Sequence, residues 1–273
     1  MKIGTLSFEV RGNHLSFKIS SSKRAKIIKQ IVDSRGPELL VCAGHALAND
    51  KEVMAVAEAL SASRSNTEIV LEAQETSQRN LSDVMDVEPS CHGMFLLRAG
   101  FEPTPLGRQW FGAARELSRH RAAYVANLAQ KSVKTSFGNL FAICCGEINL
   151  LKGSNEAKKR DCPECVSLEI NEAAGAIAMA HIIVNPTHDK MARPALVDNK
   201  RKWLSMQAQK PGICISVSNW NSEKQSSNHG RVMLQRKEDA ELHAVYVSGK
   251  VQSPERSYDQ ETEFEYREWE IPS

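Results

Sequence analysis

Two adjacent cysteines end an apolar run in the stretch FAICCGEINLL, residues 141–151. Because side chains alternate along a strand, Cys144 and Cys145 should point to opposite sides. We expect Cys144 to pack in the core, whereas the turn at Gly146 and Glu147 would present the Cys145 thiol as a nucleophile. An ordinary thiol is only slightly ionised at neutral pH, so a nucleophile here needs a neighbouring base or positive charge. The alternative is that both cysteines are small apolar core residues.

Buried strands and amphipathic helices alternate around this stretch. Apolar or alternating runs predict strands at 3–10, 14–20, 38–44, 67–74, 93–100, 139–147, 181–187, 213–220 and 264–271. A hairpin turn is expected at Gly12 and Asn13. Helical spacing with capping residues predicts helices over 20–36, 49–63, 165–180 and 198–212. This alternation predicts an α/β fold in which helices cover the faces of sheets.

Composition narrows the function classes. The chain has 273 residues, 41% of them hydrophobic and 25% charged, which fits a single globular domain spanning 1–273. With 35 basic and 33 acidic residues, the charge is too balanced to predict a nucleic-acid or membrane partner. No run approaches the ~18 apolar residues of a membrane span. Without an export signal, the seven cysteines are expected to be reduced thiols in the cytoplasm.

Three features together resemble the nitrilase superfamily of carbon–nitrogen hydrolases. They are the strand ending in Cys145-Gly146-Glu147, the later strand IIVNPTHD at 182–189, and the helix that leads into ICISVSN at 213–219. The resemblance covers roughly 138–247, and more loosely 25–75. It implies a four-layer α-β-β-α sandwich that acts on a small-molecule amide or nitrile without a cofactor or metal ion. It also implies a homodimer or higher homo-oligomer, with the tail 258–273 expected at the interface.

The family uses a cysteine as nucleophile, a glutamate as base and a lysine for the developing negative charge. The resemblance makes Cys145 the nucleophile and gives Glu147 a supporting position. Register places Gly44 where the family's glutamate belongs, so His45 and Glu72 are the two candidate replacements. The simpler interpretations are that His45 is a loop histidine without a function and that Glu72 is a surface carboxylate at the end of a strand.

The lysine is also missing from its family position. The stretch RQWFGAARE at 108–116 corresponds to that region, with Arg108 or Gln109 replacing the lysine and Glu116 as a second glutamate. An arginine could bind a substrate anion, but its planar fork differs from a lysine's point charge. Lys131 and Lys134 are expected to be solvated, at the opposite end of the following strand.

His188 follows the strand 181–187, on the side where Cys145 should lie. It is expected either to line the substrate pocket or to cap a turn. The C-x-x-C pair, Cys162 and Cys165, is expected in a loop near the pocket mouth. Because a structural zinc site needs four ligands and no second pair of this kind occurs, we expect no metal there.

Two functions from different classes therefore remain. One is a nitrilase- or amidase-like hydrolase that works through a cysteine thioester with substituted partner residues. The other is a nitrilase-fold protein that has lost turnover and acts as a binding or assembly module.

Overall fold

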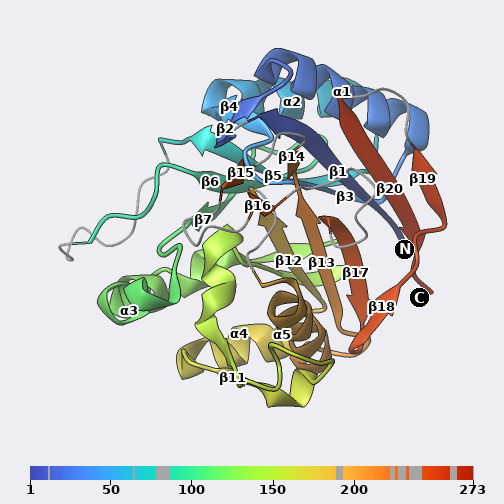
Figure 1. Cartoon of the computed structure of the whole chain (residues 1–273). Coiled ribbons are helices and arrows are strands. Elements are labelled where there is room, and N and C mark those ends of the chain that lie inside the picture. Colours follow the sequence, from blue (N-terminus) through green and yellow to red (C-terminus); the bar gives the residue numbers. More distant parts are fainter. Residues whose placement is uncertain are drawn as a thin grey trace.

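The computed structural model describes residues 1–11, 13–63, 65–77, 87–188, 193–221, 225–226, 232–233, 242–258 and 263–272. Four layers are visible: two helices above, two packed β-sheets, and helices below (Figure 1). The expected α-β-β-α sandwich is thereby confirmed.

The first sheet contains, in spatial order, β19 (Arg256–Tyr258), β20 (Phe264–Glu270), β1 (Lys2–Arg11), β3 (Leu39–Cys42), β5 (Glu68–Glu75), β6 (Gly93–Leu97) and β7 (Thr104–Arg108). β1, β3 and β5 run parallel to one another. Short strands extend this sheet: β2 (Asn13–Phe17) and β14 (Trp220–Asn221) pair with β1, and β4 (Leu47–Asn49) pairs with β5. β1 and β2 are antiparallel, as a hairpin requires, although Gly12 lies outside the described residues.

The second sheet contains β18 (Lys250–Gln252), β17 (His243–Val247), β13 (Ile213–Ser218), β12 (Ile182–Thr187), β9 (Gly138–Ala142) and β8 (Ser132–Thr135). β9, β12 and β13 are parallel. Two small pairs lie outside it, β10 (Leu151–Gly153) with β11 (Val166–Leu168), and β15 (Gln225–Ser226) with β16 (Val232–Met233). Because these strands are parallel within each sheet, the loops that follow them lie at one end of the sandwich. Ligand sites in such folds form at that end.

Helices cover both outer faces. They are α1 (Ser21–Arg35), α2 (Asp50–Ser63), α3 (Leu117–Ala126), α4 (Ala174–Met179) and α5 (Pro194–Gln207). Five short 3₁₀ segments are described between them: η1 (Ala114–Glu116), η2 (Leu128–Lys131), η3 (Cys145–Leu150), η4 (Pro163–Cys165) and η5 (Asn171–Ala173).

Strand alternation divides the core into three layers. Val41, Val70 and Ile215 belong to the cluster between the sheets. Ile69 and Leu71 lie two positions apart on β5 and therefore point to the same side of the first sheet. Both belong to the cluster between this sheet and the helices α1 and α2. A third cluster, which includes Phe141, joins the second sheet to α4 and α5. Each buried strand thus supplies side chains to two layers, which explains its continuous apolar sequence.

Capping residues fix both ends of α1, one of the two helices in the upper layer. The Ser20 side chain accepts a hydrogen bond from the Lys23 amide, and Gly36 ends α1 with φ of 55°. Glycine has no Cβ to hinder that left-handed conformation. The helices expected at 20–36 and 49–63 are confirmed as α1 and α2.

Two helix predictions need correction. The segment 165–180 is helical only from Ala174, because Val166–Leu168 pairs with β10 as a strand. The helix expected at 198–212 begins earlier, at Pro194, and ends at Gln207. Proline is favoured in the first turn because its missing N–H has no helical partner there.

A polar contact joins the two sheets. The ring of His243 on β17 contacts two hydroxyls of β1, with Nδ1 2.6 Å from Thr5 Oγ1 and Nε2 2.7 Å from Ser7 Oγ. All three side chains are buried.

The segment 258–273, expected as a tail, mostly belongs to the first sheet. β20 pairs antiparallel along β1, from Lys2 opposite Glu270 to Phe8 opposite Phe264. Tyr266 and Trp269 are buried by this pairing. A role at an oligomer interface stays a prediction.

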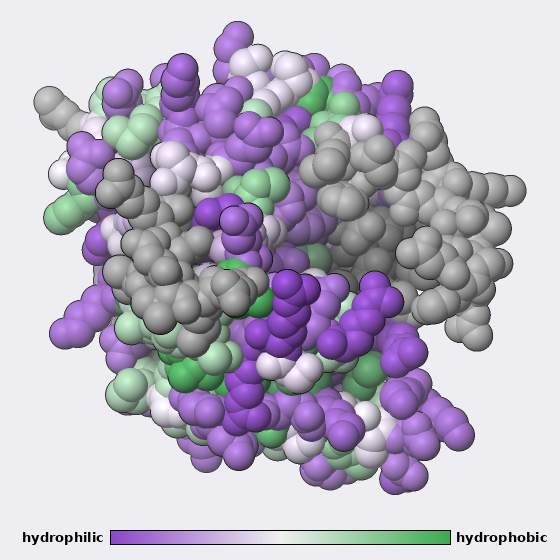
Figure 2. Space-filling view, turned by 90° about the vertical axis from the view of Figure 1, so that its left-hand side faces the viewer, coloured by the Kyte–Doolittle hydropathy of each residue, from purple (hydrophilic) through white to green (hydrophobic). Residues whose placement is uncertain are grey.

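Two features describe how the molecule meets solvent: the polarity of its surface, and the length and apolar character of its helices. On the face shown in Figure 2, hydrophilic residues predominate and hydrophobic ones form small groups. Among the described residues, no helix combines the length and apolar character needed to cross a bilayer.

The cysteines differ from expectation at one place. Cys162 and Cys165 form a disulfide in and beside η4, so the prediction of seven reduced thiols is wrong for this pair. The other five cysteines are free thiols, and Cys91 is the exposed one among them.

Candidate active site

The loops that follow the parallel strands of both sheets are tied together. The Gly44 amide, after β3, donates to the Thr187 carbonyl of β12 at 3.0 Å. The Asn219 side chain, after β13, donates to the carbonyls of Gly44 and His188 at 2.8 and 3.1 Å. Residues far apart in the sequence therefore meet at this end of the sandwich.

Cys145, His188 and Glu72 form a hydrogen-bonded chain at this end. Cys145 begins η3, shortly after β9 ends at Ala142, and His188 follows β12. His188 is hydrogen-bonded to the Cys145 side chain. Its Nε2 lies 2.8 Å from Glu72 Oε2 on β5. A thiol, an imidazole and a carboxylate in this order are the parts of an activated cysteine nucleophile.

The carboxylate of Glu72 and the imidazole of His188 each favour the other's charged form, and this mutual effect outweighs burial. Burial would raise the pKa of Glu72, but the neighbouring His188 lowers it to about 2. Burial would lower the pKa of His188, but Glu72 and then Cys145 raise it well above its usual range. His188 is therefore cationic in neutral water, and a cationic imidazole beside a thiol favours the nucleophilic thiolate. Cys145 is 9% exposed and Glu72 1%, so the chain runs from near the surface into the core.

The Glu72 carboxylate fills the space beside Gly44. A Cβ atom at Gly44 would lie 2.8 Å from Glu72 Oε2 and 2.4 Å from His188 Cδ2. The same Oε2 accepts the amide hydrogen of His45 at 3.0 Å. The resemblance expects a glutamate at position 44. Here a carboxylate lies next to that position, but the neighbouring strand supplies it.

Lys131, Glu147 and Cys144 form a second buried group next to the first. Lys131 Nζ lies 2.8 Å from Glu147 Oε2, 3.5 Å from Cys144 Sγ and 3.0 Å from the Arg108 carbonyl. The lysine side chain is fully buried, so the prediction that it is solvated is wrong, whereas Lys134 is exposed as expected. The prediction of a solvated Lys131 failed because the backbone of η2 directs this side chain inward. Its polar sequence neighbours do not indicate that direction.

This second group holds the turn that carries Cys145. Glu147 accepts the amide hydrogens of Cys144 at 3.0 Å and Trp110 at 2.9 Å. Burial would lower the pKa of Lys131, but Cys144 and Glu147 raise it, so the lysine stays charged. Burial raises the pKa of Cys144 well above its usual range. Cys144 is thus a neutral core thiol, as the strand alternation predicts.

The remaining predicted residues bind backbone groups near the turn. Arg108, at the end of β7, donates from Nε to the Ser90 carbonyl at 2.6 Å. Gln109 follows it and is half-buried. Glu116 accepts the amide hydrogens of Gly112 and Ala113 at 2.8 and 3.2 Å. The structure therefore does not bring Glu116 into the Cys145–His188–Glu72 chain.

His45 and His92 complete the surroundings of His188. His45 has φ of 60° and stacks on His188, with 3.6 Å between ring centroids. The His92 ring centroid lies 4.2 Å from that of His45 and 5.1 Å from that of His188. The sequence analysis missed His92, because no spacing links a residue before β6 to residues after β3 and β12.

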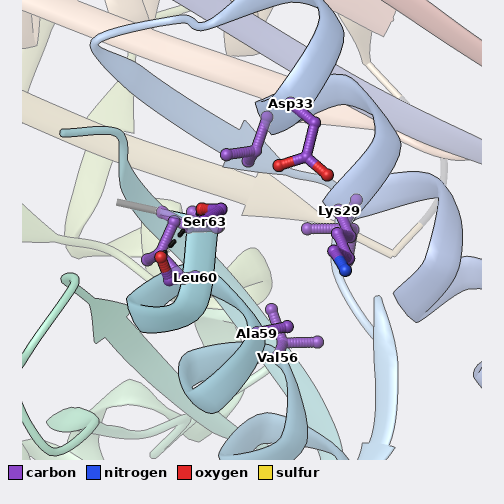
Figure 3. Close-up of a pocket in the computed structure, with 9 residues that line it drawn as sticks. Lys29, Asp33, Val56, Ala59, Leu60 and Ser63 are labelled. Atoms are coloured by element: carbon purple, nitrogen blue, oxygen red, sulfur yellow. Dashed lines mark hydrogen bonds between the residues drawn. The ribbon is translucent and has the colours of Figure 1, made fainter. Parts of the chain in front are cut away.

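A pocket elsewhere is lined by none of the described cysteines or histidines. It lies between α1 and α2 and is lined by side chains that include Lys29, Val56 and Leu60 (Figure 3). It opens on the outer side of the first sheet, and no residue of the Cys145–His188–Glu72 chain lines it.

Comparison with known proteins tests the family resemblance. No protein-family model and no curated protein matches the sequence. A carbon–nitrogen hydrolase from Helicobacter pylori G27 matches with a TM-score of 0.53 over 98% of this chain and 88% of that chain, at 11% identity. A CN-hydrolase superfamily protein from Xanthomonas campestris, solved with an arsenic adduct in its active site, matches with a TM-score of 0.51 at 10% identity. It covers 98% of this chain and 89% of the other. The chain therefore has the nitrilase-like fold of the carbon–nitrogen hydrolase superfamily, at a sequence distance where only the fold is shared.

Proposed function

We propose that this protein hydrolyses a carbon–nitrogen bond of a small amide or nitrile, with Cys145 as the nucleophile. The observation that carries the proposal is the hydrogen-bonded chain from Cys145 through His188 to Glu72. The fold supports hydrolysis of a carbon–nitrogen bond as the reaction class. The three hydrogen-bonded residues supply a nucleophile in Cys145, a proton carrier in His188, and a carboxylate in Glu72 that holds the imidazole.

For an amide, the first half of the reaction forms a thioester. The Cys145 thiolate attacks the carbonyl carbon, and a carbon–sulfur bond forms. As the carbon–nitrogen bond breaks, the His188 imidazolium donates its proton to the leaving amine. Glu72 stabilises the imidazolium before transfer and fixes the ring orientation.

The second half returns the enzyme to its starting state. Neutral His188 accepts a proton from water as the water oxygen attacks the thioester carbon. The carbon–sulfur bond breaks, the carboxylic acid leaves, and the Cys145 thiolate is again paired with the His188 cation. No other reactant is consumed.

Lys131 takes a positioning role in this proposal. The family's lysine stabilises developing negative charge, but the Lys131 amine contacts Glu147, Cys144 and the Arg108 carbonyl. An ammonium has three protons to donate, and these three contacts use them. We therefore assign Lys131 to the turn that presents Cys145 and not to the substrate.

Iodoacetamide labelling tests the nucleophile without knowledge of the substrate. At pH 7 we expect Cys145 to be alkylated faster than the exposed Cys91, because the thiolate is the reactive form. His188→Asn should slow Cys145 labelling at least tenfold and leave Cys91 labelling unchanged. Equal rates at the two cysteines, unaffected by His188→Asn, would favour the alternative of a binding module without turnover.

Turnover is tested with a panel of small amides and nitriles. Release of ammonia or amine should be lost in Cys145→Ser and should fall about 10²- to 10⁴-fold in His188→Asn, the range of a general acid–base group. An acid-quenched reaction should show an acyl adduct on Cys145 by mass spectrometry.

A further inference from the structure

Three histidines from three separate segments meet beside Cys145. His45 follows β3, His92 precedes β6 and His188 follows β12. One ring nitrogen from each can be chosen so that all three lie within 4.8 Å of one another. His45 and His188 are buried, and His92 is half-buried.

Two of the rings already have the hydrogen bonds that orient metal ligands. His92 donates from Nδ1 to the Gln74 carbonyl at 2.9 Å. His188 uses Nε2 for the Glu72 carboxylate at 2.8 Å. When neutral, each ring therefore carries its lone pair on the other nitrogen. A histidine that binds a metal almost always donates its second nitrogen to a carbonyl or carboxylate in this way.

We propose that His45, His92 and His188 bind one divalent transition-metal ion of the zinc class, with the Cys145 thiolate as the fourth ligand. Imidazole and thiolate ligands suit this class, whereas magnesium and calcium require oxygen ligands. A tetrahedral zinc ion at about 2.0–2.1 Å from nitrogen needs ligand atoms about 3.4 Å apart. The histidine rings must therefore rotate out of their present stack for the ion to bind. The anionic Glu72 beside His188 offsets part of the added charge.

Metal binding and hydrolysis would exclude each other at this site. On binding, the ion would displace the proton of the His188 cation, which is released to solvent, and would take the freed lone pair together with the sulfur with which Cys145 attacks. The bound ion would thus inhibit turnover reversibly. This inference goes beyond the proposed hydrolase and does not depend on it, because binding is measured without a substrate.

The test is a titration of chelator-treated protein with Zn²⁺ and, separately, with Co²⁺. Reduction of the Cys162–Cys165 disulfide would free two thiols beside Glu164 as competing ligands, so the titration uses a Cys162→Ser/Cys165→Ser background. We expect one ion per chain by calorimetry and by metal analysis. The Co²⁺ form should show the visible bands of tetrahedral cobalt and a thiolate-to-cobalt charge-transfer band.

Variants of His92 decide whether the cluster holds the ion. His92→Ala and the larger His92→Gln should each weaken zinc binding at least 100-fold, and circular dichroism checks their folding. His120→Ala, on α3 outside the cluster, is the matched control and should bind as the background protein does. Zinc should also protect Cys145 from iodoacetamide. Less than half an ion per chain, or equal affinity in both folded His92 variants, would overturn the proposal.

Discussion

Gly44, which follows β3, and Glu72 on the neighbouring strand β5 compete for one small volume. A single added carbon at position 44 would meet both Glu72 Oε2 and His188 Cδ2 at less than 3 Å. Because Glu72 and His188 are buried and paired, neither can move aside at low cost. The absence of a side chain at 44 is therefore a requirement of the Cys145–His188–Glu72 chain.

Gly44→Ala should destabilise the protein by roughly 1–3 kcal/mol, the usual cost of overpacking a core. Urea unfolding measures this change. Gly175→Ala is the matched control, since a Cβ there meets no atom within 4 Å and alanine suits a helix better than glycine. Combined with Glu72→Ala, the Gly44→Ala penalty should shrink, because the carboxylate that causes the clash is gone. Equal stability of Gly44→Ala and the parent chain would contradict this account.

Lys131→Met should cost about 3–5 kcal/mol, because it leaves the buried Glu147 charge without its partner. The double variant Lys131→Met/Glu147→Gln should regain part of that loss in urea unfolding. Lys134→Met, exposed on the next strand, should change stability by no more than about 0.5 kcal/mol. Similar losses in Lys131→Met and Lys134→Met would show that the buried ion pair does not hold the turn.

At the scale of elements, η3 carries Cys145, the proposed nucleophile, and packs directly on another backbone segment. A Cβ at Gly146 would lie 2.3 Å from Gly112 Cα. The Gly112 segment is itself held by Glu116. The position of Cys145 thus depends on contact between two backbones that only glycine permits.

Gly146→Ala should move η3 and slow the iodoacetamide labelling of Cys145, because the thiol would shift relative to His188. Labelling of Cys91 in the same sample provides the internal reference. A Cys145 rate that matches the parent protein, in a variant that remains folded, would show that the Gly112 contact does not position the thiol.

For the whole molecule, stability depends on the contact between the two sheets, and His243 is a polar group within it. Burial and then Arg267 lower the pKa of His243 well below its usual range. The folded chain keeps this ring neutral, whereas the unfolded chain protonates it below about pH 6.5. The unfolded state then binds more protons, so stability falls as pH falls through this range.

Between pH 6.5 and 5, we expect the free energy of unfolding to fall by up to about 1.4 kcal/mol per pH unit from this one group. His188 does not oppose this trend, because its raised pKa makes its contribution constant below pH 6.5. Glu72 begins to contribute only below its unfolded pKa of about 4.5. His243→Asn should flatten the profile measured by urea unfolding between pH 5 and 7. An equally steep profile in His243→Asn would assign the pH dependence to other groups.

Much of the architecture could be predicted from the sequence because strand and helix periodicities are local. The strand before His188 is confirmed as β12. The strand predicted at 139–147 is confirmed only as far as Ala142, because Cys145 begins the 3₁₀ segment η3. Lys131 and His92 could not be assigned in the same way. Their positions depend on how η2 and the segment before β6 pack, which is a property of the tertiary structure. The helix predicted at 165–180 failed for a similar reason, since pairing with β10 overrides its local preference.

The shared volume at Gly44 and Glu72 also constrains how such a site could change its carboxylate donor during evolution. A chain with glutamate at both positions would bury two carboxylates where one now fits, and one of them would have to be protonated. A glutamate could therefore replace Gly44 without this penalty only if the Glu72 carboxylate were lost as well.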